Sequence, residues 1–205
     1  TGPAKTTGSD LYIRDLASGA TRTVTEVAEF TLSRDEKTLA YLVSSKNDEK
    51  NGLYVLNPNF GTGGAALKAG PGKYSNLVWD EKQTRLAFFY DDSQVLPPNV
   101  APPPRVKGAP GAPAVQAPPP PPRYRVFVWD RQAKPEAPLA ARIPLRAVGG
   151  FGAVTAAVVA ADPPAPAAVS EVLSAATPGF RKGWTLAGGS PSFSLDGTKL
   201  FVSVA

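Results

Sequence analysis

The sequence predicts an all-β protein made of β-propeller blades, each with four antiparallel strands, and three observations lead to this fold class. Short alternating runs rich in β-branched and aromatic residues recur along the chain, separated by polar turns. One turn pattern occurs three times, at residues 30–43, 77–90 and 191–204. Leu39 and Leu86 are equivalent in the first two copies and lie 47 residues apart, close to the ~40–50 residues of a four-stranded blade. A meandering β-sandwich would not repeat the same order of turns and strands.

The predicted third strand of the blade has its own sequence pattern, which repeats as well. This repeat fixes the expected blade boundaries. It occurs as DLYIRDLASG, NGLYVLNPN and RYRVFVWDRQ, each leading into a turn and a short fourth strand such as ATRTVT. The chain therefore opens with the third and fourth strands of one blade, at residues 10–25. It closes with the first and second strands of another. We expect blades over residues 1–146 and the first half of a further blade over residues 190–205.

A proline-rich segment at residues 95–122 interrupts one predicted hairpin and holds 12 of the 23 prolines. Proline lacks a backbone donor and restricts the residue before it, so the segment cannot be a helix or a central strand. We expect exposed, mobile polyproline II, and prefer a tolerated insertion over a proline-motif ligand or a spacer. Residues 86–92 should then pair with residues 123–130. Deleting residues 97–122 should leave the melting temperature nearly unchanged.

The region at residues 147–189 fits the repeat less well, and two alternatives stay open. It is either a degenerate blade or a linker beside the propeller. The stretch AAVSEVLSAAT is compatible with a short helix that Pro178-Gly179 would end.

The composition excludes several chemistries, because the chain has no histidine, cysteine or methionine. A Ser-His-Asp triad cannot form within it, and a disulfide, a thiolate nucleophile and a Cys/His zinc site are excluded. The net charge of +5 is spread along the chain without a basic cluster, so we expect no nucleic-acid partner. No run approaches the ~20 apolar residues of a membrane span. We expect no cofactor.

The remaining polar and aromatic candidates all have a structural explanation. Three acidic pairs fall at predicted turns, where solvated acids are common: Asp35-Glu36, Asp48-Glu49 and Asp91-Asp92. Asp196-Gly197 is expected to form a β-turn and not a calcium site. Alternation within strands predicts that five aromatic side chains pack between blades: Tyr54, Trp79, Phe127, Trp129 and Trp184. We therefore assign no catalytic, cofactor-binding or metal-binding residue.

Two of the repeated segments resemble the propeller repeats of bacterial Tol-type and dipeptidyl-peptidase-type proteins. Residues 193–200 match the pattern Phe-Ser-x-Asp-Gly-x-x-Leu, and residues 11–16 match Leu-Tyr-Val-x-Asp-Leu. Asp and Gly have a structural cause at such a turn, so the match speaks for fold. The other copies carry Asp35-Glu36 and Glu81-Lys82 where Asp-Gly is usual. Glu26 and Glu29 are candidates to hold a peptide amino terminus by the same resemblance, but they match no motif and are not assigned.

The last thirty or so residues are similar to a segment of the N-terminal propellers of bacterial prolyl oligopeptidase-family serine peptidases. Gly183-Trp184 and residues 193–201 agree with that family, whereas Ala187-Gly188 replace its usual Ser-Glu pair. In the family, the catalytic triad belongs to a separate α/β-hydrolase domain. The segment Gly188-Gly189-Ser190 lacks the Gly-x-Ser-x-Gly elbow and is interpreted as a turn.

The resemblance implies a non-catalytic propeller that limits substrate access and docks a missing hydrolase domain, in a periplasmic or secreted peptidase. The alternative is a Tol-type propeller that binds a protein partner with no enzyme attached. Because about three blades' worth of sequence falls short of the ~4–8 of a ring, we expect an incomplete chain that joins further blades. Expressed alone, it should be poorly soluble or oligomeric. A ring closed within one chain would instead pair residues 11–15 with residues 200–204.

Overall fold

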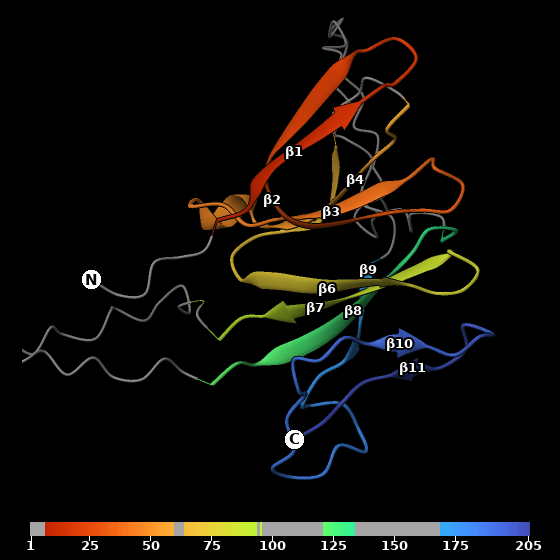
Figure 1. Ribbon diagram of the computed structural model, residues 1–205. Coiled ribbons are helices and arrows are strands. Elements are labelled where there is room, and N and C mark those ends of the chain that lie inside the picture. The colour runs from red at the N-terminus through yellow and green to blue at the C-terminus, as the bar shows by residue number, and fades with distance from the viewer. Residues whose placement is uncertain (1–6, 60–63, 94, 96–120, 134–168) are drawn as a thin grey trace, which may run out of the picture.

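The computed structural model describes residues 7–59, 64–93, 95, 121–133 and 169–205, and these form three antiparallel sheets (Figure 1). The first sheet has the order β1-β2-β3-β4-β5, with β1 Ser9–Arg14, β2 Thr21–Leu32, β3 Leu39–Val43, β4 Gly52–Leu56 and β5 Ala65–Ala69. The second has the order β6-β7-β8-β9, with β6 Lys73–Trp79, β7 Arg85–Asp91, β8 Tyr124–Asp130 and β9 Val169–Leu173. The third is the hairpin of β10 Ser192–Phe193 and β11 Leu200–Phe201. The all-β prediction is confirmed for this part of the chain.

Strand β2 is longer than the sequence predicts, because its two halves pair with different strands. Its first half pairs with β1, from Thr21 opposite Arg14 to Val24 opposite Leu11, and its second half pairs with β3 up to Leu32 opposite Leu39. Between the halves Glu26 has a φ of 58°, a left-handed conformation that bends the strand. The predicted third and fourth strands at residues 10–25 therefore continue without a break into the next predicted unit. Figure 1 shows the β1–β2 hairpin standing away from β3.

The central strand pairs of the two longer sheets have equivalent registers: β3 pairs with β4 as β7 pairs with β8. Tyr41 of β3 lies opposite Tyr54 of β4, and Phe88 of β7 lies opposite Phe127 of β8. The predicted pairing across the proline-rich segment is confirmed, because β7 and β8 pair from Arg85 opposite Asp130 to Asp91 opposite Tyr124. Residues 96–120 of that segment lie outside the described residues.

The repeated turn is the same at the level of individual hydrogen bonds. A backbone bond of 2.9 Å closes each copy, from Ser33 N to Thr38 O, from Asp80 N to Arg85 O, and from Ser194 N to Lys199 O. Three positions after the first residue, each turn has a residue with positive φ: Glu36, Gln83 and Gly197. The alignment of residues 30–43, 77–90 and 191–204 therefore agrees with the structure, but the sequence analysis named the wrong pair in the second copy. Lys82-Gln83, and not Glu81-Lys82, occupies the place of Asp196-Gly197.

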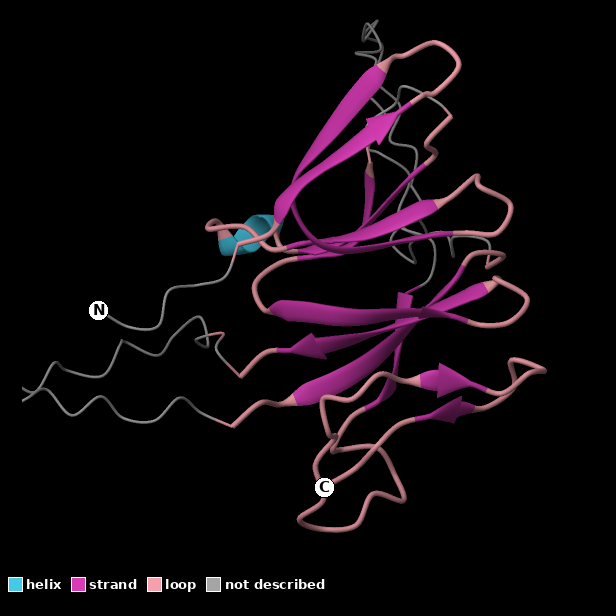
Figure 2. Ribbon diagram, viewed as in Figure 1, coloured by secondary structure: helices cyan, strands magenta, loops and turns pink. Residues whose placement is uncertain are grey.

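The three turns also contact one another in order along the chain. Arg34 of the first turn places Nη1 3.0 Å from Oε1 of Glu81 in the second. Arg85, at the end of the second, donates from Nη1 to the carbonyl oxygen of Gly197 in the third at 2.9 Å. A Cβ on Gly197 would lie 3.0 Å from Oδ2 of Asp80, so the approach is close. Figure 2 shows the three turns one below another along the right-hand side.

The expected short helix in residues 167–177 is wrong where the structure describes it. Residues 169–173 form β9, which pairs with β8 from Trp129 opposite Val169 to Val126 opposite Leu173. Hydrogen bonds to the open edge of β8 override the helix propensity of Glu171 and Leu173, and the β-branched Val169 and Val172 favour a strand. Residues 147–168 lie outside the described residues. The only helix described is the 3-10 turn η1 Asp48–Lys50.

Alternating side chains bury the faces of the sheets against each other. On β3, Ala40 and Leu42 face the second sheet and join its main cluster with Phe88 and Trp129. The opposite face of β3 carries Leu39 and Tyr41, which pack against the β1–β2 hairpin through its apolar side chains Leu11, Ile13 and Val24. A third cluster joins Phe89 and Val126 of the second sheet to Leu186, Leu200 and Val202. The chain is thus a stack of sheets in sequence order.

Candidate functional site

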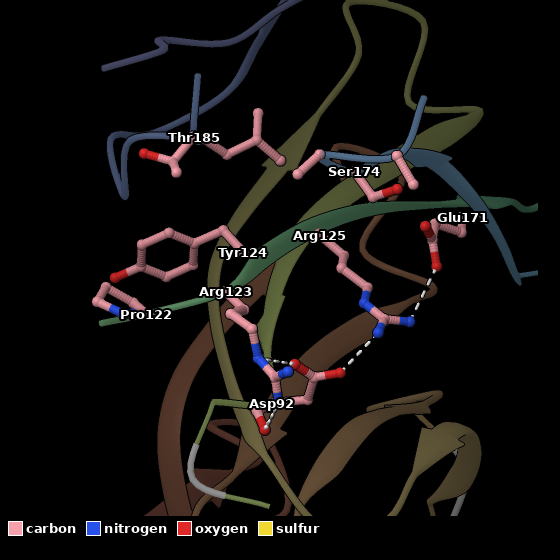
Figure 3. Close-up of a pocket in the computed structure, with 11 residues that line it drawn as sticks. Asp92, Pro122, Arg123, Tyr124, Arg125, Glu171, Ser174 and Thr185 are labelled. Atoms are coloured by element: carbon pink, nitrogen blue, oxygen red, sulfur yellow. Dashed lines mark hydrogen bonds and ion pairs between the residues drawn. The ribbon is translucent and has the colours of Figure 1, made fainter. Parts of the chain in front are cut away.

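A polar cavity lies at the edge of the second sheet, where β7 ends and β8 begins. Its volume is about 320 Å³. Asp92 follows β7, Arg123 and Arg125 lie at the start of β8, Glu171 comes from β9, and Thr185 comes from the segment before β10 (Figure 3). These residues are distant in sequence, and antiparallel pairing of three strands brings them together.

The charges in this cavity are paired with one another. Arg125 places Nη2 2.7 Å from Oδ2 of Asp92 and Nη1 3.5 Å from Oε2 of Glu171. Arg123 places Nε 3.2 Å from Oδ1 of Asp92, which is an ion pair without hydrogen-bond geometry, since that buried oxygen accepts no hydrogen bond. Arg123 also donates from Nη2 to the Asp92 carbonyl oxygen at 3.2 Å. Two guanidinium groups thus face two carboxylates, and a ligand would have to exchange with these pairs.

The adjacent acids Asp91 and Asp92 have different roles. Asp91 is the last residue of β7 and is buried, with Oδ1 accepting from the backbone N–H groups of Ser93 and Arg123 at 2.9 Å each. It therefore holds the start of β8 beside the end of β7. Asp92 alone lines the cavity. The two carboxylates do not face each other across a cleft.

The other acids lie at turns as predicted, and Asp35 and Asp196 accept hydrogen bonds there. Asp35 accepts from Arg131 Nη2 at 2.8 Å, from the Ser33 hydroxyl and from the backbone N–H of Lys37; these bonds, with Arg131 first, hold the pKa of Asp35 well below its ordinary value. Asp48 and Glu49 form the first turn of η1, where the side chain of Asn47 accepts from Glu49 N at 3.1 Å. Bonds from Ser194 and then Thr198 lower the pKa of Asp196 to about 2.

The predicted packing role holds for four of the five aromatic residues. Trp79 and Trp129 contact each other with ring centroids 5.9 Å apart, Phe127 stacks on Phe88 at 5.6 Å, and Tyr54 stacks on Tyr41 at 5.6 Å. Trp184 differs, because it is exposed and lies outside the sheets. It contacts only Phe180 and, through a cation–π contact of 5.1 Å, Arg181 among the ring interactions of the described residues.

Glu29 is fully engaged in the structure and does not present a free carboxylate. Its Oε2 accepts from Asn76 N and its Oε1 from Leu77 N, both at 2.8 Å, at a bulge in β6 where Asn76 has a φ of 61°. Asn76 in turn donates from Nδ2 to the carbonyl oxygens of Gly188 and Gly189 at 3.3 and 3.4 Å. Because Asn76 lies 47 residues after Glu29, equivalent positions of the repeat each reach forward to the next unit.

Ser190 lies where the sequence analysis expects it, in an exposed turn before β10. The sequence analysis did not identify Lys68 as a residue that joins the two longer sheets. Lys68 extends from β5 to the second sheet, with Nζ 4.6 Å from the ring centre of Phe127 and 5.0 Å from that of Tyr90, and burial lowers its pKa. A single lysine in a short strand gives no sequence signal for such a contact.

The described residues contain no group of three or more Asp, Glu, His or Cys side chains placed to hold a metal ion. No helix in the same part of the chain is long and apolar enough to cross a membrane. Comparison with known proteins adds no identification: no protein-family profile matches the chain, and no curated protein matches its sequence.

Proposed function

We propose that this chain is a non-catalytic β-propeller part of a bacterial serine peptidase, which limits access of substrates and docks an α/β-hydrolase domain. The observation that carries the propeller is the stack of equivalent turns. Each sheet repeats the same hydrogen-bonded turn, and Arg34 and Arg85 link each turn to the next. A sandwich of two sheets has no reason to repeat a turn and its forward contact in three successive sheets.

The peptidase role rests on the C-terminal resemblance. Its Gly-Trp pair lies at Gly183, which has a φ of 92°, and at the exposed Trp184. Because an indole at the surface contributes little to a core, Trp184 is suited to contact a neighbouring domain. Without histidine, the chain has no base to activate Ser190, so catalysis in the parent protein is assigned to residues outside this chain.

The charged cavity favours one alternative, a Tol-type propeller that binds a protein partner. Arg123 and Arg125 line a cavity of about 320 Å³ together with Glu171, and such side chains suit recognition of a polar peptide segment. This role needs no hydrolase domain.

A fluorophosphonate probe on the natural parent protein tests the two candidates. Antibodies against this chain would isolate the parent polypeptide from its source cells, and the probe labels activated serines of serine hydrolases. We expect labelling on the same polypeptide that carries this chain, and a Gly-x-Ser-x-Gly elbow in its reading frame. The purified chain itself should stay unlabelled by the probe, and its Ser190→Ala variant should be equally unlabelled. An unlabelled parent without the elbow would reject the peptidase and support the binding protein.

A further inference from the structure

We propose that the polar cavity at the start of β8 binds a small zwitterion, a ligand with one ammonium and one carboxylate group, such as a free amino acid or a short peptide with free termini. In this role Arg123 binds the ligand carboxylate and Glu171 binds the ligand ammonium. Arg125 and Asp92 keep their own ion pair and position the other two groups (Figure 3). This binding role goes beyond the proposed function and is independent of a peptidase role.

The charged side chains that line the cavity balance one another. Two are the guanidinium groups of Arg123 and Arg125, and two are the carboxylates of Asp92 and Glu171. Lys68 does not line the cavity, and its Nζ lies over aromatic rings. A ligand of one charge sign would leave the cavity with a net charge, which is costly where the charged side chains are partly buried. A zwitterion offers a partner to both signs and adds no net charge, so the balance favours a zwitterion over an anion or a cation.

Two of the four charged groups are held loosely enough to exchange partners. The Arg123 side chain is 65% exposed, and its Nε faces Asp92 Oδ1 at 3.2 Å without a hydrogen bond. Glu171 contacts Arg125 only through Oε2, at 3.5 Å, and its Oε1 accepts no hydrogen bond from the described residues. Arg123 and Glu171 can therefore turn to a ligand at little cost, and they have opposite charges.

The other two groups are held firmly and set the distance that a ligand has to span. Arg125 places Nη2 2.7 Å from Oδ2 of Asp92, whose side chain is only 17% exposed. Nη1 of the same guanidinium group faces Glu171, whereas Asp92 also contacts Arg123. Arg125 therefore separates the two groups that bind the ligand. In a free amino acid a single Cα atom lies between ammonium and carboxylate, whereas two extended residues span about 7 Å. A short peptide fits this separation better than a free amino acid.

The strand register brings the binding groups to one face of the second sheet. Arg123 and Arg125 are two residues apart on β8, and Glu171 of β9 lies opposite Phe127, two residues further along. Residues two apart on a strand share a face, and so do directly opposite residues of an antiparallel pair. Backbone pairing therefore fixes the relative positions of the three charged side chains. The cavity that they line has a volume of about 320 Å³, which is room for a short peptide.

A series of diglycine derivatives tests the charge class of the ligand. Diglycine is a zwitterion, N-acetyl-diglycine an anion, diglycinamide a cation, and N-acetyl-diglycinamide carries no charge. Each compound is titrated into the isotope-labelled 205-residue chain, and the NMR shifts of the backbone amides of residues 123–125 and 171–174 give its dissociation constant. We expect diglycine to bind at least ~10-fold more tightly than the other three, because only diglycine gives both Arg123 and Glu171 a charged partner.

Three results of this titration would overturn the proposal. Equal binding of N-acetyl-diglycine would show an anion site, and equal binding of N-acetyl-diglycinamide would show a site for an internal peptide segment. The third is an absence of diglycine binding up to about 10 mM. Glycine in the same titration identifies the source of the zwitterion: weaker binding than diglycine supports a short peptide, and tighter binding supports a free amino acid.

Two variants test the role assigned to each binding residue. In Glu171→Gln, diglycine should lose its preference over N-acetyl-diglycine, because the amide no longer selects an ammonium group; in Arg123→Gln it should lose its preference over diglycinamide. Glu49→Gln and Arg181→Gln are the matched controls, since both residues are exposed and lie outside the cavity, and they should keep the wild-type preferences. A preference that survives in Glu171→Gln or in Arg123→Gln would overturn the proposal. Neither result bears on probe labelling of a parent peptidase.

Discussion

The first complete unit, from the second half of β2 to β5, and the second, from β6 to β9, have the same strand order but very different connections. In the first unit, β3 and β4 are joined by a short turn that contains η1. In the second, the chain between β7 and β8 runs from Asp92 to Arg123. The ladder is nevertheless intact in both, with Tyr41 opposite Tyr54 and Phe88 opposite Phe127. Register is therefore set by side-chain alternation and packing, and not by the length of the connection.

The two units differ more in how their faces are covered. The second lies between the first sheet and the β10–β11 hairpin, and both Phe88 and Phe89 are fully buried. Among the described residues, one face of the first unit meets only the β1–β2 hairpin, and Phe30 and Leu32 on that face are exposed. Equivalent positions of the repeat should consequently contribute unequally to stability.

The largest expected effect compares Phe88→Ala with Tyr41→Ala, at equivalent positions in the two units. Phe88 is fully buried and stacks between Tyr74 and Phe127, at 6.2 and 5.6 Å, so its removal should cost about 3–5 kcal/mol of unfolding free energy. Tyr41 faces the thinner cluster, and its removal should cost at least ~1 kcal/mol less. Urea unfolding measures both.

Leu195→Ala is the control for this pair, because Leu195 is 84% exposed and should change stability by less than ~0.5 kcal/mol. Equal losses for Phe88→Ala and Tyr41→Ala would mean that the first unit is as well covered as the second.

A smaller effect is expected for Glu29→Gln, which tests the contact that joins the units. The amide can accept only one of the two backbone hydrogen bonds that the carboxylate accepts from Asn76 and Leu77. Loss of a charge-assisted bond at a bulge should cost about 1–2 kcal/mol in urea unfolding. Glu26→Gln, three residues away on the same strand, should change stability by less than ~0.5 kcal/mol. A cost for Glu26→Gln as large as that for Glu29→Gln would refute a specific role for the contact.

Sequence patterns predicted the strands and their pairing because alternation and turn residues are local signals. The β7–β8 pairing could be predicted across the proline-rich segment for this reason. The pair equivalent to Asp196-Gly197 was misassigned by one residue in the second turn, because that turn has neither Asp nor Gly at those two positions. Its acid is Asp80 at the first position, which accepts from Thr84 N and Arg85 N at 2.7 and 2.8 Å. The strand β9 was missed because the Ala, Glu and Leu residues in and around it favour a helix, so its local sequence gives no clear strand signal.

The candidate site could not be predicted at all. Asp92, Arg125 and Glu171 belong to three separate segments, and only the order β7-β8-β9 brings them together. The contacts that Glu29 and Asn76 make with the next unit could not be predicted either, because an acid and an amide at equivalent positions share no sequence motif. Such contacts depend on how sheets stack, and that is a property of the whole repeat.

The smallest expected effect concerns acid stability and compares the first and third turns with the second. Bonds from Ser194 and Thr198 hold the pKa of Asp196 at about 2, against an ordinary 3.8, and bonds led by Arg131 lower the pKa of Asp35. A carboxyl group whose pKa is depressed in the folded state stabilises the fold above its unfolded pKa, and that contribution is lost as pH falls through the folded value. Asp196→Asn should therefore lower the unfolding midpoint at pH 6, and most of the difference from the wild type should be lost as the pH falls from about 4 to about 2. The second turn has Lys82 at this position, so Lys82→Gln should give a difference that does not change between pH 6 and pH 2.

Because Asp196 is exposed, solvent screening keeps the effect of Asp196→Asn small. Urea midpoints at half-unit pH intervals measure it, and a constant offset for Asp196→Asn down to pH 2 would show that the carboxylate charge does not stabilise the turn.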